Sequence, residues 1–391
     1  YQEWCFELQT CFVLTQQWQC AGWLDEYLGR TQKAQERYKK ANAVFDLART
    51  LNATGDHHQA RQGFESLQHW LHAAQSAHMG KDFHGAISLL QSWLNEKGSN
   101  YSRYFRALVY MNLGDSFHQN GDTDKANQAF LEASQLLEEQ ADNEERHGQR
   151  KAAYRCYQAL MSMGILSQSH ESLIEGGLNC IRLLKEMNQR FNTMRQYHEL
   201  IHHSRQMNAW RSAAELYQEA SLFAKQVSFV YSDWFWNEAG LSWQSVAEHQ
   251  LASNNPVDLV ENALISAGHC FSQTQEIRHL KQVYQMLCVL DFPKKKKEKY
   301  ERILSYLEEE HQDRSHHTPA FPEHFQRPLH NQDFRWHDLL SLELKNEPLA
   351  MLSSLLAPGQ DAWQVQRRRT LIFLLREKAH LPKNDLEDKI L

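Results

Sequence analysis

Proline and glycine are scarce in this chain, which has 8 Pro and 16 Gly among its 391 residues. Because these two residues interrupt helices most strongly, their scarcity leaves long stretches in which a helix can continue. Signals for β-strands are also few, and the clearest β-rich stretch, residues 227–231, runs directly into the aromatic residues at 234–236. We therefore expect an all-α fold, in which residues 227–231 form a loop that leads into a helix.

Paired cysteines and long apolar runs are missing as well. The 7 cysteines include no Cys-x-x-Cys pair and lack the dense spacing of a disulfide-rich scaffold, so we expect reduced and mostly buried thiols. No apolar run approaches the roughly 20 residues that span a bilayer. Residues 1–20 also lack the basic start and uninterrupted apolar segment of a secretory signal. These absences predict a cytoplasmic protein that does not enter a membrane.

An excess of positive charge is absent too, because the chain carries a formal net charge of −6 and has a pI near 6.4. A general nucleic-acid binder needs an excess of Lys and Arg to displace counterions from phosphates, so nucleic acid is not an expected partner. The basic run at 294–299 is a local exception, and an acidic run at 308–310 follows it. We interpret the basic run as the solvated start of a helix.

Motifs for catalysis and cofactor binding are largely absent. The sequence contains no phosphate-binding Gly-x-x-x-x-Gly-Lys-Ser/Thr loop, no His-Glu-x-x-His and no Gly-x-Ser-x-Gly. His198 and His202 lie at i and i+4, which could supply two metal ligands from one helical face, but no third ligand with supporting spacing is identifiable. His269 and Cys270 are neighbours on a helix and point about 100° apart, which is unsuited to a nucleophile and its base. The sequence therefore favours a protein without metal, cofactor or catalytic site, although it leaves an enzymatic activity open.

Residues 107–136 carry the strongest positive signal, a pattern typical of two antiparallel helices packed side by side. The first predicted helix, the turn and the return helix carry, in order, Tyr110, Leu113, Gly114 and Phe117; Gly121; and Ala126, Phe130 and Ala133. The small residues permit close approach of the two backbones, and the large ones fill the space beside them. Such a pair is too small to bury a core alone, so we expect it to stack on neighbouring pairs.

The same pattern recurs in weaker form in three further places, at residues 44–67, 197–220 and 264–287. The helix around Trp236 looks like another first helix, whose partner is displaced by an insertion at 254–256. Two stretches, 56–79 and 123–146, are long enough to predict extended second helices. Because the copies are unevenly spaced, we expect an irregular array.

The hairpin at 107–136 resembles the tetratricopeptide repeat, whose first helix carries large, Leu, Gly and Tyr residues and whose second carries Ala, Phe and Ala at these offsets. The resemblance implies a TPR-like α-α superhelix, a solenoid of antiparallel helix pairs, with a C-terminal helical extension. We expect three parts: an N-terminal helical segment at 1–30, the helical repeats at 31–290, and a linker with a C-terminal helical module at 291–391.

The character of the sequence changes after Tyr300. Residues 314–337 contain several prolines and histidines with little periodicity, as expected of a linker or a docking segment. Helices are predicted at 336–355 and 363–375, separated by Ala-Pro-Gly. Both ends of the chain start or stop within apolar sequence, which suggests that it is part of a larger protein.

The resemblance also implies where a partner would bind, because this family lines a concave groove with particular positions of its first helices. Carried onto the matching positions of this chain, the expected groove residues are Arg49, Asn52, Asp115, His118, Arg195, His198, His202, Arg205 and His269. They differ from the Lys/Asn clamp with which some relatives hold a C-terminal carboxylate. Arg49, Arg195 and Arg205 would instead suit an acidic or polar peptide through bidentate contacts.

The favoured hypothesis is a non-enzymatic module that binds a protein or peptide, as a scaffold, an adaptor or the sensing arm of a larger regulatory protein. A second hypothesis is a small-ligand-binding regulator or an enzyme, with its site in the aromatic region around Trp234, Trp236 and Trp243. A third is a regulator whose repeats compact when a peptide binds, since adjacent repeats contact only their neighbours. The sequence does not separate this third hypothesis from a static scaffold.

Overall fold

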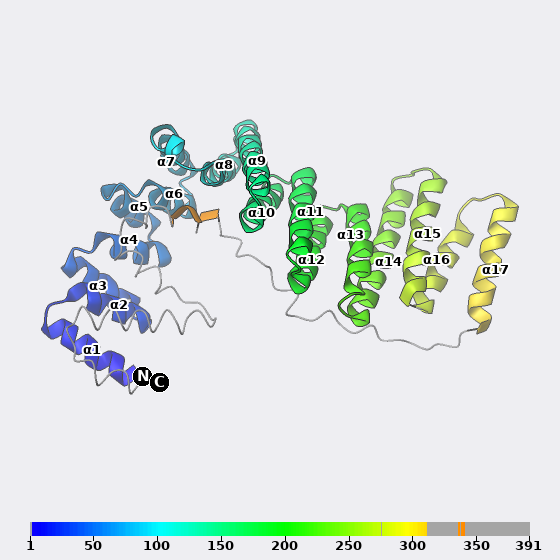
Figure 1. Cartoon of the computed structure of the whole chain (residues 1–391), viewed down its shortest axis with the longest axis horizontal. Coiled ribbons are helices and arrows are strands. Elements are labelled where there is room, and N and C mark those ends of the chain that lie inside the picture. The colour runs from blue at the N-terminus through cyan, green and yellow to red at the C-terminus, as the bar shows by residue number, and fades with distance from the viewer. Residues whose placement is uncertain (1, 275, 311–334, 337, 341–391) are drawn as a thin grey trace. The chain divides into compact units, whose positions relative to one another are not determined.

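The structure is a computed structural model that describes residues 2–274, 276–310, 335, 336 and 338–340 (Figure 1). These residues form seventeen α-helices, one short 3-10 helix and a further helical stretch near residue 335, and they include no strand. The predicted all-α fold is therefore confirmed. The chain divides into two compact units, which are described one after the other.

Unit 1 comprises Tyr1–Ala133 and Asp333–Leu391. The helices that it contains whole are α1 (Gln2–Leu14), α2 (Trp18–Tyr27), α3 (Thr31–Ala41), α4 (Val44–Ala53), α5 (His57–Ser66), α6 (Trp70–Met79), α7 (Phe83–Glu96), the 3-10 helix η1 (Gly98–Asn100) and α8 (Arg103–Gln119). Each α-helix of this series packs against the next one in sequence. The described residues between 335 and 340 are helical and belong to the same unit.

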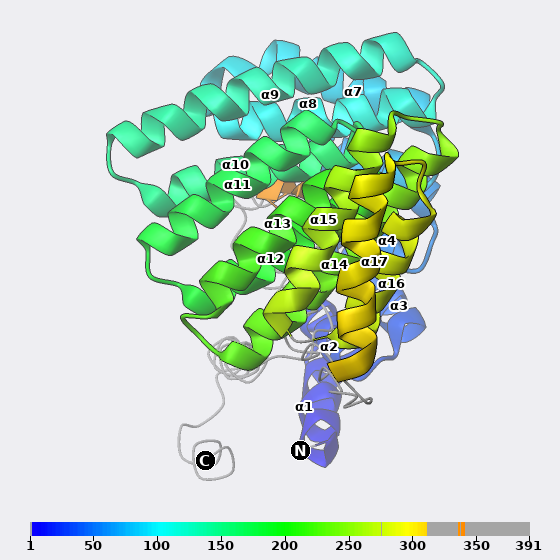
Figure 2. The ribbon, with the colours of Figure 1, turned by 90° about the vertical axis from the view of Figure 1, so that its right-hand side faces the viewer.

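Unit 2 comprises Ser134–Gln332, and α9 (Thr123–Arg146) runs across the division between the units. The remaining helices are α10 (Arg150–Leu166), α11 (His170–Glu186), α12 (Arg190–Gln206), α13 (Trp210–Ala224), α14 (Phe229–Ala252), α15 (Val257–Thr274), α16 (Ile277–Val289) and α17 (Lys294–Glu310). Consecutive helices from α10 to α17 pack on one another, and Figure 2 shows several of them side by side. This is the arrangement of a helical-repeat array.

Many turns between helices contain a residue in the left-handed backbone region. Gly55 and Gly121 take this conformation at the turns where the sequence predicted them, with φ of 92° and 87°. Asn208 takes it at the turn of the hairpin predicted at 197–220, and Asn188 takes it at a further turn, with φ of 58° and 55° respectively. Asparagine tolerates this region better than most residues. The turn geometry thus recurs without its glycine, which explains why several hairpins look degenerate in sequence.

Helices approach closely where a glycine on one faces a large side chain on the next. A Cβ atom added at Gly114 of α8 would lie 2.7 Å from the Phe130 ring of α9. A Cβ atom added at Gly22 of α2 would lie 2.5 Å from the Tyr38 ring of α3. The two pairs have the same separation in sequence. Such distances leave no room for a side chain, so glycine sets the spacing of these helices.

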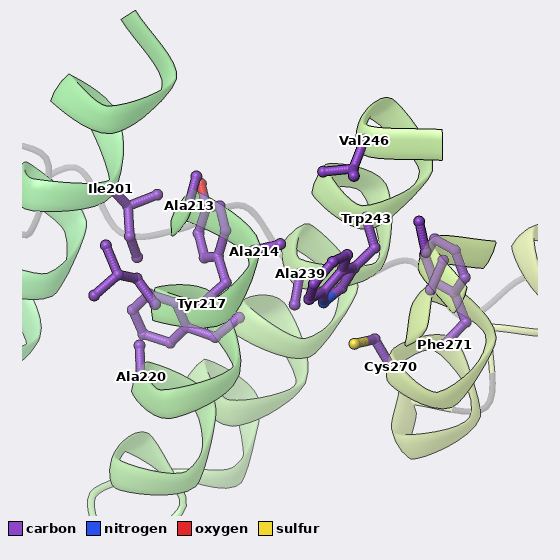
Figure 3. Close-up of a cluster of buried hydrophobic side chains, with 14 of the residues drawn as sticks. Ile201, Ala213, Ala214, Tyr217, Ala220, Ala239, Trp243, Val246, Cys270 and Phe271 are labelled. Carbon is purple, nitrogen blue, oxygen red and sulfur yellow. The ribbon is translucent and has the colours of Figure 1, made fainter. Parts of the chain in front are cut away.

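A continuous buried cluster forms the core of unit 2, and part of it is drawn in Figure 3. It extends from Met161 in α10 to Tyr300 in α17. In its middle, Trp243 of α14 is buried between Tyr217 of α13 and Phe271 of α15. A core without a boundary between helix pairs is expected when each pair buries its apolar face on its neighbours.

Four of the predicted hairpins are confirmed as helix pairs. Residues 107–136 lie in α8 and α9, residues 44–67 in α4 and α5, residues 197–220 in α12 and α13, and residues 264–287 in α15 and α16. Residues 227 and 228 lead into α14 as predicted, but that helix begins at Phe229, so residues 229–231 belong to the helix and not to the predicted loop.

Two predictions about helix continuity were wrong. Residues 56–79 form two helices, α5 and α6, because the backbone turns at Gln68, where φ is 59°. The partner of α14 is not displaced by an insertion, because α15 packs directly on it and Gly240 faces the ring of Phe271. Residues 264–287 still form the predicted hairpin, because α15 also packs on α16, and a Cβ atom added at Gly268 would meet Leu280 and Val283 of α16.

The predicted C-terminal region is described only in part. The helical stretch at 335–340 agrees with the helix predicted from residue 336, whereas the predicted helix at 363–375 lies outside the described residues. The boundaries expected at residues 30 and 290 stay predictions. None of the described helices has both the length and the apolar character needed to cross a membrane.

Replacing Gly176 by alanine is expected to destabilise unit 2, although alanine has the higher helix propensity. A Cβ atom at Gly176 of α11 would lie 2.7 Å from the backbone oxygen of Tyr157 in α10, so the two helices would have to separate. We expect a net loss of about 1–3 kcal/mol, measured as a lower urea midpoint in circular dichroism. The matched control is Gly268→Ala in α15, whose added Cβ would meet Leu280 and Val283 at an ordinary 3.6 Å. That variant should gain about 0.5–1 kcal/mol, and equal shifts in the two variants would contradict the packing described here.

Candidate functional site

Three of the nine predicted groove residues meet at one pocket of unit 2. The pocket has a volume of about 410 Å³ and is lined by His198, His202, Arg205 and Gln206 of α12, Tyr217 of α13, and Trp234 and Glu238 of α14. His202 and Arg205 are exposed at its rim. Three of the four expected positions on α12 therefore line a concave surface, which we call the α12–α14 pocket.

Arg205 is engaged on several sides within this pocket. Its guanidinium lies 3.5 Å from the carboxylate of Glu238 and donates a 3.4 Å hydrogen bond to the Tyr217 hydroxyl. Its Cζ atom also lies 5.4 Å from the centroid of the Trp210 ring. Burial raises the pKa of Glu238, and the positive charge of Arg205 opposes that shift. An acidic partner would therefore have to compete with Glu238 for Arg205.

The pocket presents neutral imidazole and aromatic surface beside this ion pair. Burial, and then the neighbouring His202, lower the pKa of His198 to about 4, so His198 is uncharged at neutral pH. The centroid of its ring lies 6.2 Å from that of Trp234. Within the part of the chain that the structure describes, no group of three or more His, Cys, Asp or Glu could hold a metal ion. The surface is suited to polar and aromatic side chains of a partner.

Four other predicted groove residues are not among the residues that line this pocket. His118 is exposed in the last turn of α8, and His269 is exposed on α15, where its ring lies edge-on to a tryptophan of α14. Arg195 is half-buried on α12, and its charge acts on Tyr154 of α10. The side-chain oxygen of Asn52 lies 2.8 Å from the imidazole of a histidine in α5. Their part in partner binding stays a prediction.

Arg49 is committed to an internal ion pair. Its two terminal nitrogens donate hydrogen bonds to the two carboxylate oxygens of Glu26 in α2, one of them at 2.6 Å. Burial disfavours the charged guanidinium, but the contacts with Glu26 outweigh this and raise the pKa of Arg49. Tyr38 of α3 donates a 2.8 Å hydrogen bond to the same carboxylate. The side chain of Arg49 therefore joins three helices of unit 1, and its part in binding an acidic partner stays a prediction.

Asp115 of α8 is the predicted groove residue that holds a chain segment from elsewhere in the sequence. Its Oδ2 atom accepts hydrogen bonds from both terminal nitrogens of Arg335, each at 3.2 Å, across a separation of 220 residues. Arg335 lies in the helical stretch at 335–340, drawn in orange in Figure 1. The two side chains are only 11% and 12% exposed, so water screens their attraction weakly.

Further contacts hold this stretch on unit 1. Tyr104 of α8 donates a 2.7 Å hydrogen bond to Asp338. Trp336 is buried, with its ring centroid 5.9 Å from that of His78 in α6, and Leu339 is fully buried. The stretch thus contributes a cation, a carboxylate and two large apolar side chains to one surface. We call the surface that carries His78, Tyr104 and Asp115 the α6/α8 face.

His78 lies at the centre of these contacts. Its Nε2 atom is 3.7 Å from a carboxylate oxygen of Asp115, and its Nδ1 atom is 3.0 Å from the Ser116 hydroxyl oxygen. Burial lowers the pKa of His78, Asp115 opposes that shift, and the charge of Arg335 lowers the pKa further. His78 is therefore neutral at pH 7 while the stretch is docked.

Sequence reasoning missed most of the α6/α8 face. It named Asp115 but neither His78 nor Tyr104, and it did not connect the expected linker or docking segment with Asp115. The available signal was Trp336 and Leu339, spaced by three residues in a region that the sequence predicted to be a docking segment followed by a helix. What was lacking was any indication of where that segment would bind.

The tryptophans proposed to form a small-ligand or enzyme site lie in different surroundings in the structure. Trp243 is buried in the core of unit 2 (Figure 3), whereas Trp234 lines the α12–α14 pocket. Cys270 is also buried, and burial raises the pKa of its thiol to about 11. A thiol with that pKa is protonated at neutral pH and is a poor nucleophile. Trp243 and Cys270 therefore have the surroundings of packing residues.

Removing the guanidinium of Arg49 is expected to destabilise unit 1. Arg49→Ala would leave Glu26 largely buried, with 13% of its side chain exposed, and without its cation. We expect a loss of about 2–3 kcal/mol in urea denaturation, somewhat less than for a fully buried pair. Arg61→Ala is the control, because Arg61 pairs with the more exposed Asp82 and should cost about 1 kcal/mol or less. Equal stability of the two variants would argue against the structural role of Arg49.

Docking of the 335–340 stretch is expected to weaken as the pH falls below about 6.5, the ordinary pKa of histidine. The docked state lowers the pKa of His78, and release of the stretch removes Arg335 and the covering Trp336. The released state therefore binds the proton more tightly, so acid favours release and docking is fully retained above that pH.

Fluorine NMR of the fluorotryptophan-labelled chain measures this release, with the Trp336 resonance assigned through Trp336→Phe. We expect the resonance to move toward its solvent-exposed position on acidification. His78→Gln should abolish the response, because glutamine does not titrate. A resonance that stays constant in the wild-type chain would refute the pH dependence.

The chain is similar to a solved structure described as a circular tandem repeat protein with novel repeat topology and enhanced subunit contact surfaces. The two are 13% identical, the comparison covers 98% of this chain and 81% of that one, and the TM-score is 0.17. Because this score is low, the assignment as a helical-repeat protein rests on the packing of consecutive helices in the chain itself. No protein-family model matches the chain, and no curated protein matches it.

Proposed function

We propose that this chain is a non-enzymatic helical-repeat module that recognises a segment of a protein, acting as a scaffold, an adaptor or the sensing arm of a larger regulator. The observation that carries the proposal is the docking of Arg335 on Asp115 at the α6/α8 face. A helical surface that buries Arg, Trp and Leu side chains of a distant helical stretch has the chemistry of helix-in-groove recognition. The same surface could serve a segment of another protein.

The helix pairs are divergent tetratricopeptide repeats in this proposal. Support comes from Gly114 with Phe130 and Gly22 with Tyr38, where a glycine on the first helix faces an aromatic ring on the second at the same separation in sequence. The second pair was not among the hairpins predicted from the sequence. It would place α2 and α3 within the repeat array, which would then begin before residue 31.

The α12–α14 pocket is a second surface that supports partner recognition. Its neutral His198 and Trp234 lie beside the Arg205–Glu238 ion pair. Polar and aromatic side chains gain from such surroundings without burying an unpaired charge. An acidic segment is our proposal for this pocket, with Arg205 exchanging Glu238 for a carboxylate of the partner.

A small-ligand-binding regulator or an enzyme is the competing proposal. Its support is the α12–α14 pocket beside Trp234. Tight stoichiometric binding of a small metabolite that is lost in Trp234→Ala, with helix content unchanged, would favour it over peptide recognition.

Selection of peptides from a random library tests the proposed function. The baits are the wild-type chain, the Trp336→Ala chain, an Asp115→Asn chain and a His202→Ala/Arg205→Ala chain. We expect selected peptides to bind at least about tenfold more weakly to one of the two surface variants, a loss of roughly 1.4 kcal/mol or more, with unchanged circular dichroism. Arg211→Ala is the control, since its side chain is 74% exposed on α13 outside both surfaces. Failure of every bait to enrich a peptide would show that the proposed function is wrong.

A further inference from the structure

We propose that residues 335–340 are an internal occupant of the α6/α8 face, and that its external partner is a helical protein segment presenting Arg, Trp, Asp and Leu with the same spacing. The inference rests on the proposed function, because it names the partner for one of the two recognition surfaces. Binding of the partner and release of the internal stretch are then one exchange.

The charge of the α6/α8 face selects the first anchor of the partner. Asp115 is 9% exposed, and a carboxylate that is this buried is costly unless a cation or several hydrogen bonds compensate it. Arg335 supplies both terminal nitrogens to one of its oxygens. His78 lies 3.7 Å away but is neutral while the stretch is docked. A partner that displaces Arg335 must therefore bring its own Arg, and an acidic segment would be repelled.

The apolar anchors and the second polar contact fix the spacing and the direction of the partner. In a helical segment, residues at i, i+3 and i+4 share one face, which describes Arg335, Asp338 and Leu339. Tyr104 donates its hydroxyl hydrogen to Asp338, at the opposite end of the stretch from Arg335. A segment bound in the reverse direction would bring its carboxylate toward Asp115, so like charges disfavour it.

The covalent connection explains why the stretch occupies the face in the isolated chain and why it can still be exchanged. An attached segment acts at an effective concentration set by its linker, which is about millimolar for a short flexible linker and lower for a longer one, and this adds to the contacts that keep it docked. The stretch is held by burial of two apolar side chains, by the ion pair of Arg335 with Asp115, and by the hydrogen bond from Tyr104. An external segment with the same anchors and additional contacts can compete. Because it binds only chains whose face is open, its apparent affinity is its intrinsic affinity multiplied by the fraction of open chains.

Fluorescence anisotropy with a labelled synthetic peptide tests the exchange. The probe has the sequence of residues 331–344, and it is titrated with the full wild-type chain and with a released chain carrying Arg335→Glu and Trp336→Ala. We expect the released chain to bind the probe at least about tenfold more tightly, because its own stretch no longer competes. Tyr104→Phe in the released chain should weaken binding by a few-fold, since it removes the hydroxyl that donates to Asp338.

Control peptides and variants keep the test decisive. A probe that carries Arg335→Gln should lose most of its affinity for the released chain, and this control leaves the protein itself unchanged. If the double variant fails to fold by circular dichroism, Arg335→Gln alone in the chain replaces it. Equal affinity of the probe for the wild-type and released chains would overturn internal occupancy. Absence of binding to both would overturn the assigned partner chemistry, whereas the proposed function stands or falls with the library selection.

Discussion

Close packing of each helix on the next is the constraint on which the rest of this structure depends, and glycine sets its distance. At Gly22, Gly114 and Gly240, an aromatic ring of the neighbouring helix occupies the place where a Cβ atom would lie. A helix pair is too thin to enclose a core, so it buries its apolar face on the adjacent pairs. The core of unit 2 consequently runs without interruption from α10 to α17, and faces that no neighbouring helix covers are left for other segments.

Two Arg–carboxylate contacts in unit 1 show how similar chemistry serves different purposes. Arg49 and Glu26 lie on nearby helices and join α4 to α2, so their contact forms as the helices stack. Arg335 reaches Asp115 across 220 residues, and closing a loop of that length has an entropic cost that a local contact does not have. The first contact is therefore suited to stability. The second depends on a segment distant in sequence, which in our proposal a helix of the same chemistry replaces.

The two proposed recognition surfaces would bind different side chains of a partner. The α6/α8 face has a buried carboxylate that requires a cation, together with room for Trp and Leu side chains. The α12–α14 pocket already contains both charges of an ion pair and adds neutral imidazole and indole surface. If both surfaces bind partners as proposed, each unit would engage a different segment, which is what the proposed adaptor role requires.

The sequence by itself determined the helical class, several of the helix pairs and several turns, because these follow from local periodicity and from the scarcity of proline and glycine. It failed at Gln68, where a non-glycine residue in the left-handed region ends a helix without a distinctive local signal. It named Asp115 as an expected groove residue but could not identify Arg335, which Asp115 contacts in the structure. Only the tertiary structure decided that Asp115 holds Arg335 while Arg49 holds Glu26, because contacts between residues distant in sequence depend on how all the intervening helices stack, and no local pattern encodes that.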